Sequence, residues 1–347
     1  MKPRDIARLR LAHHHISAPG KTAAEVVASL VAMQAQDYLG ALWSVGLRTA
    51  QATEATITEA IADRQIVRTW PMRGTLHFVA AADVRWLLAL LTPRIITSAA
   101  GRHQKLGLDA EVFARSRKLL IKALVGGQSL SRDTVYQILE RGGIATKDQR
   151  GYHILWRLAQ EGLICCASHI GKQPSFALLD EWVPAHPVMD RETSLGTLAL
   201  RYFEGHGPAT LADFVWWSGL KISDARKALE MVASKLVKEE DFWIGAGAST
   251  AKTTRLIHLL PCFDEYLLGY TDRSAVLDPQ HAAGIIAGGM FLPTVVVQGQ
   301  VIGTWRRTLK GKEVRLALKA FADAPDKAVE AAAKKYGDFL GLPLVVV

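Results

Sequence analysis

In the middle of the chain, apolar positions first recur at helical spacing and then alternate. Residues 113–179 contain two helical patterns separated by Gly142-Gly143, and a third helical pattern follows them. Ser129 or Ser131 is placed to cap the second helix, and the glycines are placed to end it. The chain then alternates and turns at Gly171-Lys172, as a two-stranded wing does. Helix, helix, helix and hairpin is the order of a winged helix-turn-helix unit.

The same order recurs over residues 194–244. A helical pattern ends near Gly205 and Gly207, Thr210 is placed to cap the next helix, and a third helix leads into strand-like residues. The first part of the chain is a more divergent copy. Its pattern predicts a helix to about Met33, two short helices over 41–47 and 54–62, and two strands over 65–70 and 74–79.

The remaining residues, from about Leu256, favour strands and one helix. Residues 291–305 read as a strand, a turn at Gln298-Gly299 and a second strand, and residues 309–312 read as a turn between two strands. An alanine-rich helix over 325–341 and a final buried strand complete this part. The patterns therefore predict an α+β chain with three tandem winged helix-turn-helix units and a C-terminal mixed α/β extension. The predicted domains are 1–110, 111–190, 191–255 and 256–347.

Composition limits the class of protein. The chain has 347 residues, 49% hydrophobic and 22% charged, which fits a soluble protein of two or three domains. Its apolar runs are too short for a transmembrane helix, and its charged N-terminus lacks the apolar core of a signal peptide. Three cysteines, two of them adjacent, favour a reducing cytoplasm. His13-His14-His15 is expected to be a solvated helix end, so no metal or cofactor is predicted.

Net charge of +9 favours a polyanionic partner, because each phosphate contact releases condensed counterions. Charge alone is equally compatible with a merely basic soluble protein. The charges gather around the predicted turn at 309–312, however, where Arg306, Arg307, Lys310 and Lys312 are separated by few residues. The sequence therefore predicts a basic hairpin that contacts DNA phosphates.

The segment Gln34-Ala35-Gln36-Asp37 follows the first helical pattern, and its polar side chains are candidates for a catalytic role. In an extended chain, residues two apart point to the same face, so both glutamine amides would meet at one small object. Each amide has an acceptor and two donors, and together they can hold a water molecule. A short polar pattern of this kind is also typical of an ordinary helix end.

Three other segments of the sequence are more specific than the glutamine pattern alone. Residues 68–88 contain Arg73-Gly74-Thr75-Leu76-His77, residues 259–277 contain an Asp-Glu pair in an aromatic run, and residues 303–309 read Gly-Thr-Trp-Arg-Arg-Thr-Leu. In this order, and over nearly the whole chain, these segments resemble the bacterial AlkZ/YcaQ-like winged-helix DNA glycosylases. That family includes members with Gln-apolar-Gln and members with Gln-apolar-Asp, and this chain is similar to the first kind.

The resemblance implies a monofunctional DNA glycosylase that hydrolyses the N-glycosidic bond of N7-alkylguanine or N3-alkyladenine in duplex DNA. Gln34 and Gln36 would be its catalytic residues. No lysine is placed as a Schiff-base nucleophile, and bulky adducts and interstrand crosslinks are plausible substrates because a shallow channel need not enclose the base. Asp37 is a stronger base, but in an extended segment it points away from Gln36. We expect a monomer that is cytoplasmic and associated with the bacterial nucleoid.

Four further residues are candidate DNA contacts. Arg150 and Arg157 lie on the third helix of the middle unit, which is the recognition helix of a winged helix. Arg73 is placed to touch phosphate, and His77 either lines the cleft or is a hydrogen-bonded strand residue. Asp264 and Glu265 are expected in a loop, as structural partners of nearby arginines.

Two other functions remain open from the sequence. The first is a non-catalytic winged-helix DNA-binding protein or transcription regulator, since winged helices occur far more often in regulators than in enzymes. The second is an enzyme that acts on a small molecule. A regulator would make no abasic sites in alkylated DNA, and a small-molecule enzyme would have little affinity for DNA.

Overall fold

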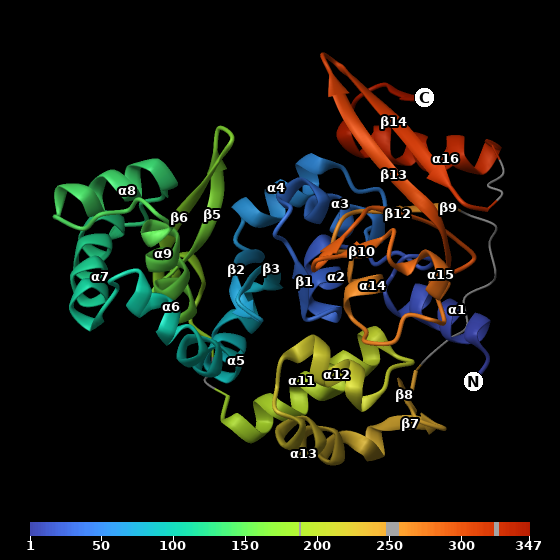
Figure 1. The fold of residues 1–347 in the computed structure, drawn as a ribbon, viewed down its shortest axis with the longest axis horizontal. Helices are drawn as coiled ribbons and strands as arrows, with labels where there is room; N and C mark the ends of the chain where they lie inside the picture. The colour runs from blue at the N-terminus through green and yellow to red at the C-terminus, as the bar shows by residue number, and fades with distance from the viewer. Residues whose placement is uncertain (187–188, 248–256, 323–325) are drawn as a thin grey trace. The chain divides into compact units, whose positions relative to one another are not determined.

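The computed structural model describes residues 1–186, 189–247, 257–322 and 326–347 (Figure 1). Contacts within the chain divide it into two compact bodies. The larger body comprises Met1–Thr58 and Leu195–Val347, and the smaller body comprises Glu59–Ser194. In the described residues, no helix has both the length and the apolar character needed to cross a membrane. The predicted four-domain division stays a prediction, and its boundary at 255/256 lies outside the described residues.

The smaller body combines a mixed set of helices with one sheet. Its strands hydrogen-bond in the order β3-β2-β5-β6-β4. Its elements are β2 (Ile66–Met72), β3 (Thr75–Ala80), a 3-10 turn (Ala81–Asp83), α5 (Val84–Ser98), α6 (Ala100–Lys105), α7 (Ala110–Leu124), β4 (Leu130–Ser131), α8 (Arg132–Arg141), α9 (Arg150–Gln160), β5 (Ile164–Ile170), β6 (Gln173–Leu178) and α10 (Leu179–Trp182).

The middle part of the smaller body confirms the predicted element order. The hydroxyl of Ser131 accepts a hydrogen bond from the backbone N–H of Thr134 and caps α8. Strand β5 ends one residue before Gly171, and β6 begins one residue after Lys172, so the wing turns where the sequence predicts. The buried face of α9, with Leu155 and Leu158, packs into one apolar cluster with α7, α8 and the sheet. These contacts stabilise the three helices and the wing as one packed unit.

The larger body is built from the first four helices, a second helical segment and the C-terminal sheet. Helix α4 continues from it into the smaller body. Its elements are α1 (Pro3–His13), α2 (Ala23–Ser29), β1 (Ala32–Gln34), α3 (Tyr38–Arg48), α4 (Glu54–Ala62), α11 (Arg191–His206), α12 (Leu211–Ser218), α13 (Ile222–Val232), a 3-10 turn (Ala233–Lys235), β7 (Leu236–Glu239), β8 (Phe242–Gly245), β9 (Ile257–Leu260), α14 (Glu265–Leu268), α15 (Pro279–Ala282), β10 (Ile286–Ala287), β11 (Met290–Phe291), β12 (Thr294–Val297), β13 (Gln300–Lys310), β14 (Glu313–Ala320), α16 (Asp326–Leu340) and β15 (Leu344–Val346).

The helical segment that begins at α11 again has three helices followed by the hairpin β7–β8. Thr210 caps α12 as predicted, and its partner in a capping box is Asp213. Helix α11 ends at His206, between the two glycines that the sequence marks as its end.

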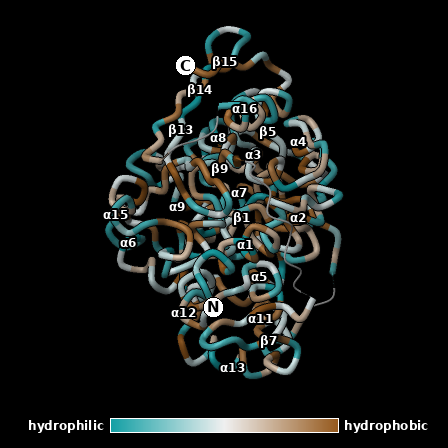
Figure 2. Tube along the Cα trace, turned by 90° about the vertical axis from the view of Figure 1, so that its right-hand side faces the viewer, coloured by the Kyte–Doolittle hydropathy of each residue, from teal (hydrophilic) through white to brown (hydrophobic). Residues whose placement is uncertain are grey.

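The C-terminal sheet has the strand order β15-β14-β13-β12-β9. Its pairs are antiparallel except β14 with β15, and β13 and β14 stay paired up to Lys310 and Glu313. The basic hairpin is thus confirmed as a hairpin, with its turn at Gly311-Lys312, and its tip is hydrophilic in Figure 2. Helix α16 packs against β9 and places the Phe339 ring where a Cβ at Gly46 would lie 2.3 Å from it. Only glycine permits that approach between α3 and α16.

Three expectations about local structure are wrong. Helix α2 ends at Ser29 rather than near Met33, because Val31 has a left-handed backbone with φ of 66° and β1 begins directly after it. The final strand is not buried, since β15 is an edge strand whose Val345 side chain is 44% exposed. The acidic segment is not a loop throughout: Leu259 and Leu260 end β9, and Glu265 begins α14.

Candidate active site

The glutamine motif lies in the larger body, where a short strand passes into a helix. Gln34 is the last residue of β1 and is half-buried, Gln36 is exposed in a bend, and Asp37 is the N-cap residue of α3. The extended backbone therefore reaches Gln34 and not Gln36. The predicted convergence of both amides on one object stays a prediction.

The side chain of Gln34 contains a buried polar atom. Its side-chain oxygen Oε1 accepts no hydrogen bond from the described residues. Leaving a buried acceptor without a donor costs about 1–3 kcal/mol unless a water or a ligand supplies the donor. The backbone of the same residue, in contrast, is firmly held.

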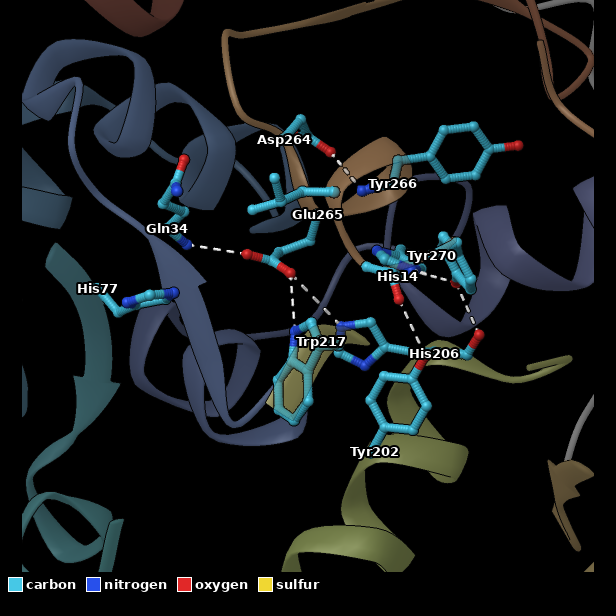
Figure 3. A network of polar contacts seen from close by, with 12 residues as sticks. His14, Gln34, His77, Tyr202, His206, Trp217, Asp264, Glu265, Tyr266 and Tyr270 are labelled. Atoms are coloured by element: carbon cyan, nitrogen blue, oxygen red, sulfur yellow. Dashed lines mark hydrogen bonds and ion pairs between the residues drawn. The ribbon is translucent and has the colours of Figure 1, made fainter. Parts of the chain in front are cut away.

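Glu265 is the group that holds it. Its side chain is 1% exposed, and its Oε1 accepts the backbone N–H of Gln34 at 2.9 Å (Figure 3). Its other oxygen, Oε2, accepts the indole N–H of Trp217 at 3.0 Å. One carboxylate on α14 therefore fixes the end of β1 to a ring on α12. These two donors are a backbone amide and an indole, and the expectation that Glu265 also partners an arginine stays a prediction.

His206 is the third neighbour of Glu265. Its Nε2 lies 3.7 Å from Oε2 of Glu265, beyond hydrogen-bonding distance. Burial lowers the pKa of His206 although the carboxylate raises it in part. The contact is therefore one between a carboxylate and an uncharged ring at neutral pH, and it adds little ion-pair attraction.

His14 extends this buried network on the other side of His206. The hydroxyl of Tyr270 donates to the backbone oxygen of His206 at 2.6 Å and lies 2.8 Å from Nε2 of His14. Since the tyrosine proton is used, Nε2 of His14 must be the donor in that bond. Burial lowers the pKa of His14 well below its ordinary value. The expected solvated helix end is thus wrong for His14, which is fully buried.

Asp264, the neighbour of Glu265, makes the ion pair that the sequence predicts. Both of its oxygens bind Arg48, at 2.6 and 2.8 Å, and one also accepts the hydroxyl of Ser44 at 2.8 Å. The two charged side chains are almost fully buried. This bidentate pair connects the start of α14 to the end of α3 and so fixes the helix that carries Glu265.

In the smaller body, Arg73 occupies the two-residue turn between β2 and β3. Both Arg73 and Gly74 have positive φ, which is the geometry of a tight hairpin turn. His77 is fully buried on β3, its Nδ1 lies 2.9 Å from the backbone oxygen of Thr75, and its Nε2 lies 3.4 Å from Nη2 of Arg73. His77 is therefore a hydrogen-bonded strand residue. Whether it also lines a substrate cleft stays a prediction.

The two arginines of α9 have partners within the protein. Arg150 donates to the backbone oxygen of Ala145 at 3.0 Å, to that of Gly107 at 3.1 Å and to that of Leu106. Arg157 donates to Glu161 one turn along, at 2.5 Å. Arg150 therefore has a structural role, and a contact of either arginine with DNA stays a prediction.

The hairpin residues differ in their freedom to reach a partner. Arg306, Lys310 and Lys312 are exposed, whereas Arg307 is half-buried and donates to the hydroxyl of Tyr336 on α16. Arg307 thus anchors the hairpin to α16, and a contact of any of these four residues with DNA stays a prediction.

The sequence reading missed Glu265 and His14 as members of this network. Glu265 is 231 residues from Gln34, so no local pattern could have joined them. One signal in the sequence could have revealed Glu265: this acid is followed directly by apolar and aromatic residues. A carboxylate buried among such residues needs hydrogen-bond donors around it.

The class of protein is shown by comparison with known families, which places the chain among the DNA glycosylases. The profile of the AlkZ-like DNA glycosylase family matches residues 27–339, so the chain belongs to this family, and it is a DNA glycosylase, which hydrolyses N-glycosidic bonds. The chain is 27% identical over 335 residues to the "Interstrand DNA cross-link repair glycosylase" of Streptomyces sahachiroi, with 89% of this chain and 88% of the relative covered. Its fold is similar to the solved structure of the Streptomyces sahachiroi DNA glycosylase AlkZ, with a TM-score of 0.79, 25% identity and complete coverage of both chains.

Proposed function

We propose that this protein excises N7-alkylguanine and N3-alkyladenine from duplex DNA by hydrolysis, with Gln34 and Gln36 as catalytic residues. The observation that carries the proposal is the state of Gln34. Its backbone is held by a buried carboxylate, and its amide oxygen is buried without a donor among the described residues. A carbonyl dipole fixed in this way can act on a substrate at no further cost of reorganisation.

The leaving group makes this chemistry feasible without a strong acid. An N7- or N3-alkylated purine already carries a positive charge. When the bond between C1′ and the base nitrogen breaks, its electron pair neutralises the base. The sugar becomes cationic, a water oxygen bonds to C1′, and the proton of that water passes to solvent. The protein must place the water and oppose the positive charge on the sugar.

The two glutamines suit both of these tasks. An amide carbonyl accepts a hydrogen bond from water and presents negative partial charge to the sugar, but it does not take a proton at neutral pH. Glu265 is a positioning residue in this mechanism, because it is buried and contacts Gln34 through the backbone. The absence of a lysine from these tasks favours hydrolysis without strand cleavage.

The proposed DNA contacts are of two kinds. The exposed Arg306, Lys310 and Lys312 of the hairpin β13–β14 would bind phosphates, together with Arg307 at its base. Arg73, His77, Arg150 and Arg157 are the proposed contacts on the smaller body. We also propose that the helix-and-hairpin segments around α9 and α13, together with the divergent N-terminal segment, are three winged-helix units.

The substrate range is proposed from the relative. The Streptomyces sahachiroi protein is named an interstrand crosslink repair glycosylase, and the same bond is broken at each purine of such a crosslink. We therefore propose that bulky adducts and interstrand crosslinks are substrates here too. The proposed enzyme acts as a monomer and works in the cytoplasm, at the bacterial nucleoid.

The test is base excision from a duplex with a single N7-methylguanine, scored by alkaline cleavage under single-turnover conditions. We expect abasic sites with the wild-type protein, and few with Gln34→Ala at equal DNA affinity. If the protein binds this duplex and an undamaged duplex but makes no abasic sites, it is instead a non-catalytic DNA-binding protein or regulator.

A further inference from the structure

A cavity of about 570 Å³ lies beside the glutamine motif, entirely within the larger body. Asp37, which directly follows Gln36, forms part of its wall. The rings of Trp43, Trp305 and Tyr336 form another part, and Cys262 and Leu292 contribute from two loops. A ligand in this cavity would therefore contact Asp37, which is adjacent in sequence to the proposed catalytic residue Gln36.

The aromatic walls of this cavity are rigid. The indole N–H of Trp43 donates to the backbone oxygen of Leu259 at 2.7 Å, and that of Trp305 donates to the backbone oxygen of Leu260 at 2.7 Å. The ring of Tyr336 packs edge-on against both, with centroids 4.9 and 5.2 Å away. These rings are held by β9 and by one another, so the cavity is formed before any ligand binds.

The charges of the lining match a DNA-borne ligand. Arg306 and Lys319 are exposed and line the cavity from β13 and β14, and Asp37 is the carboxylate among the lining side chains. Cations placed beside an apolar, aromatic space fit a ring system that is attached to a phosphate backbone. The carboxylate, next to Gln36, opposes the positive charge of an alkylated purine.

We propose that this cavity binds the aromatic body of a bulky alkylating agent that is attached to the damaged purine. The inference rests on the proposed glycosylase function and extends it to a specificity site. Its volume falls in the range of about 300–1,000 Å³ that holds drug-sized ligands, which is more than a single nucleobase needs.

The first test fills the cavity. Thr304 lines it and is half-buried on β13, whereas Thr308, four residues along the same strand, is exposed and lies outside it. We compare single-turnover excision of N7-(naphthylmethyl)guanine and N7-methylguanine. Thr304→Trp should lower the ratio of the bulky to the small rate by about tenfold or more, the effect of about 1.4 kcal/mol. Thr308→Trp, the matched control, should leave the ratio unchanged. An unchanged ratio in Thr304→Trp would overturn the proposal.

The second test measures occupancy directly and does not depend on catalysis or on a substitution. Cys262 is half-buried in the cavity, while Cys165 and Cys166 are buried elsewhere. Alkylation of Cys262 by iodoacetamide, followed by mass spectrometry, thus reports access to the cavity. The DNA carries a 2′-fluoro sugar at the lesion, which resists hydrolysis.

The naphthylmethyl duplex should protect Cys262 at least fivefold more than the methyl duplex at equal saturation. Equal protection by both duplexes would show that DNA or a base, and not the adduct, covers the cavity, and it would overturn the proposal, as would no protection. If the wild-type protein excises neither lesion, the proposed function fails, and the protection result still decides whether the cavity takes the adduct.

Discussion

At the scale of single residues, the proposed catalysis rests on Gln34, whose backbone N–H is held and whose side-chain oxygen has no partner within the described part of the chain. The hydrogen bond from its backbone N–H to Glu265 fixes the position of the backbone from which the side chain extends. The buried Oε1 then has no donor among the described residues. A group of this kind lowers stability by itself, and a substrate or a water in the reaction offsets that loss.

The first prediction follows from this placement. Gln34→Ala and Gln36→Ala should each reduce the single-turnover excision rate by roughly 10² or more, as removal of one preorganised polar group does in other enzymes. The double variant should lose far less than the product of the single losses, because two groups that hold one water act as a unit. Rates at saturating enzyme measure this, with thermal unfolding and DNA affinity as controls. Full activity in both single variants would leave Asp37 as the next candidate.

Substitutions of the adjacent residues Glu265 and Asp264 can separate an effect on the position of Gln34 from an effect on folding stability. In Glu265→Gln, the amide keeps the size of the side chain but brings N–H donors toward donors from Gln34 and Trp217. The excision rate at saturating enzyme should therefore fall by roughly tenfold or more, about 1.4 kcal/mol or above, while DNA affinity changes little.

Asp264→Asn is the matched comparison for Glu265→Gln. It leaves the buried Arg48 without its charge partner, which typically costs 3–5 kcal/mol of folding stability, so at least about that order is expected. Because Glu265 keeps its own bonds to Gln34 and Trp217 in this variant, the folded fraction should retain most of its excision rate. If Glu265→Gln merely destabilises the protein and its folded fraction excises normally, Glu265 has no positioning role.

At the scale of elements, the sequence specifies local features well and their surroundings poorly. The cap at Ser131, the wing turn at Gly171-Lys172 and the hairpin turn at Gly311-Lys312 are all where the pattern predicts them. Each depends on a hydroxyl or a glycine acting within a few residues. The burial of β15 and the partner of Glu265 depend on chain segments that are far away in sequence, and no periodicity contains them.

The candidate site also has features that the sequence predicts and features that it does not. The sequence pattern correctly places Asp264 with an arginine. The catalytic roles that the pattern and the family resemblance assign to Gln34 and Gln36 stay predictions. The pattern did not reveal that the extended segment stops at Gln34 or that His14 is buried. The extended segment stops because α3 begins at Tyr38, with Asp37 as its N-cap residue. His14 is buried because it packs against Tyr270 and His206.

The hairpin β13–β14 should act as a phosphate contact. Lys310→Ala and Lys312→Ala each remove an exposed cation near the turn, so each should weaken binding to damaged and undamaged duplex alike. The slope of log K against log salt should become flatter by about one unit per lost contact. Fluorescence anisotropy over a salt series measures it. A slope that stays the same in the double variant would place the hairpin away from DNA.

The arginines of α9 should differ from each other. Arg150 has three backbone acceptors, so Arg150→Ala should lower the free energy of unfolding by about 1–3 kcal/mol. Arg157 has one partly exposed ion pair, and Arg157→Ala should change stability by less than about 1 kcal/mol. Urea unfolding measures both. Reduced DNA binding in Arg157→Ala at unchanged stability would support a recognition role, and equal large destabilisation would make both arginines structural.

At the scale of the whole molecule, buried histidines make the fold sensitive to acid. Burial lowers the pKa of His13 and of His258 to about 4, and it also lowers those of His14 and His206. In the unfolded chain a histidine has a pKa of about 6.5. Between those values the unfolded chain binds protons that the folded protein does not, so the free energy of unfolding falls as pH falls.

The last prediction concerns the size of this loss of stability at low pH and the contribution of one histidine to it. Stability should be constant above about pH 7 and should decline from about pH 6.5 toward pH 4, by up to about 1.4 kcal/mol per pH unit for each such histidine. His258→Leu, on β9, should make the decline shallower by up to that amount, because a residue that cannot bind a proton contributes nothing to the difference. Urea midpoints for the wild type and the variant at several pH values measure it. Parallel curves for the two proteins would mean that His258 titrates alike in the folded and unfolded chains, and that its burial in the sheet has no effect on acid stability.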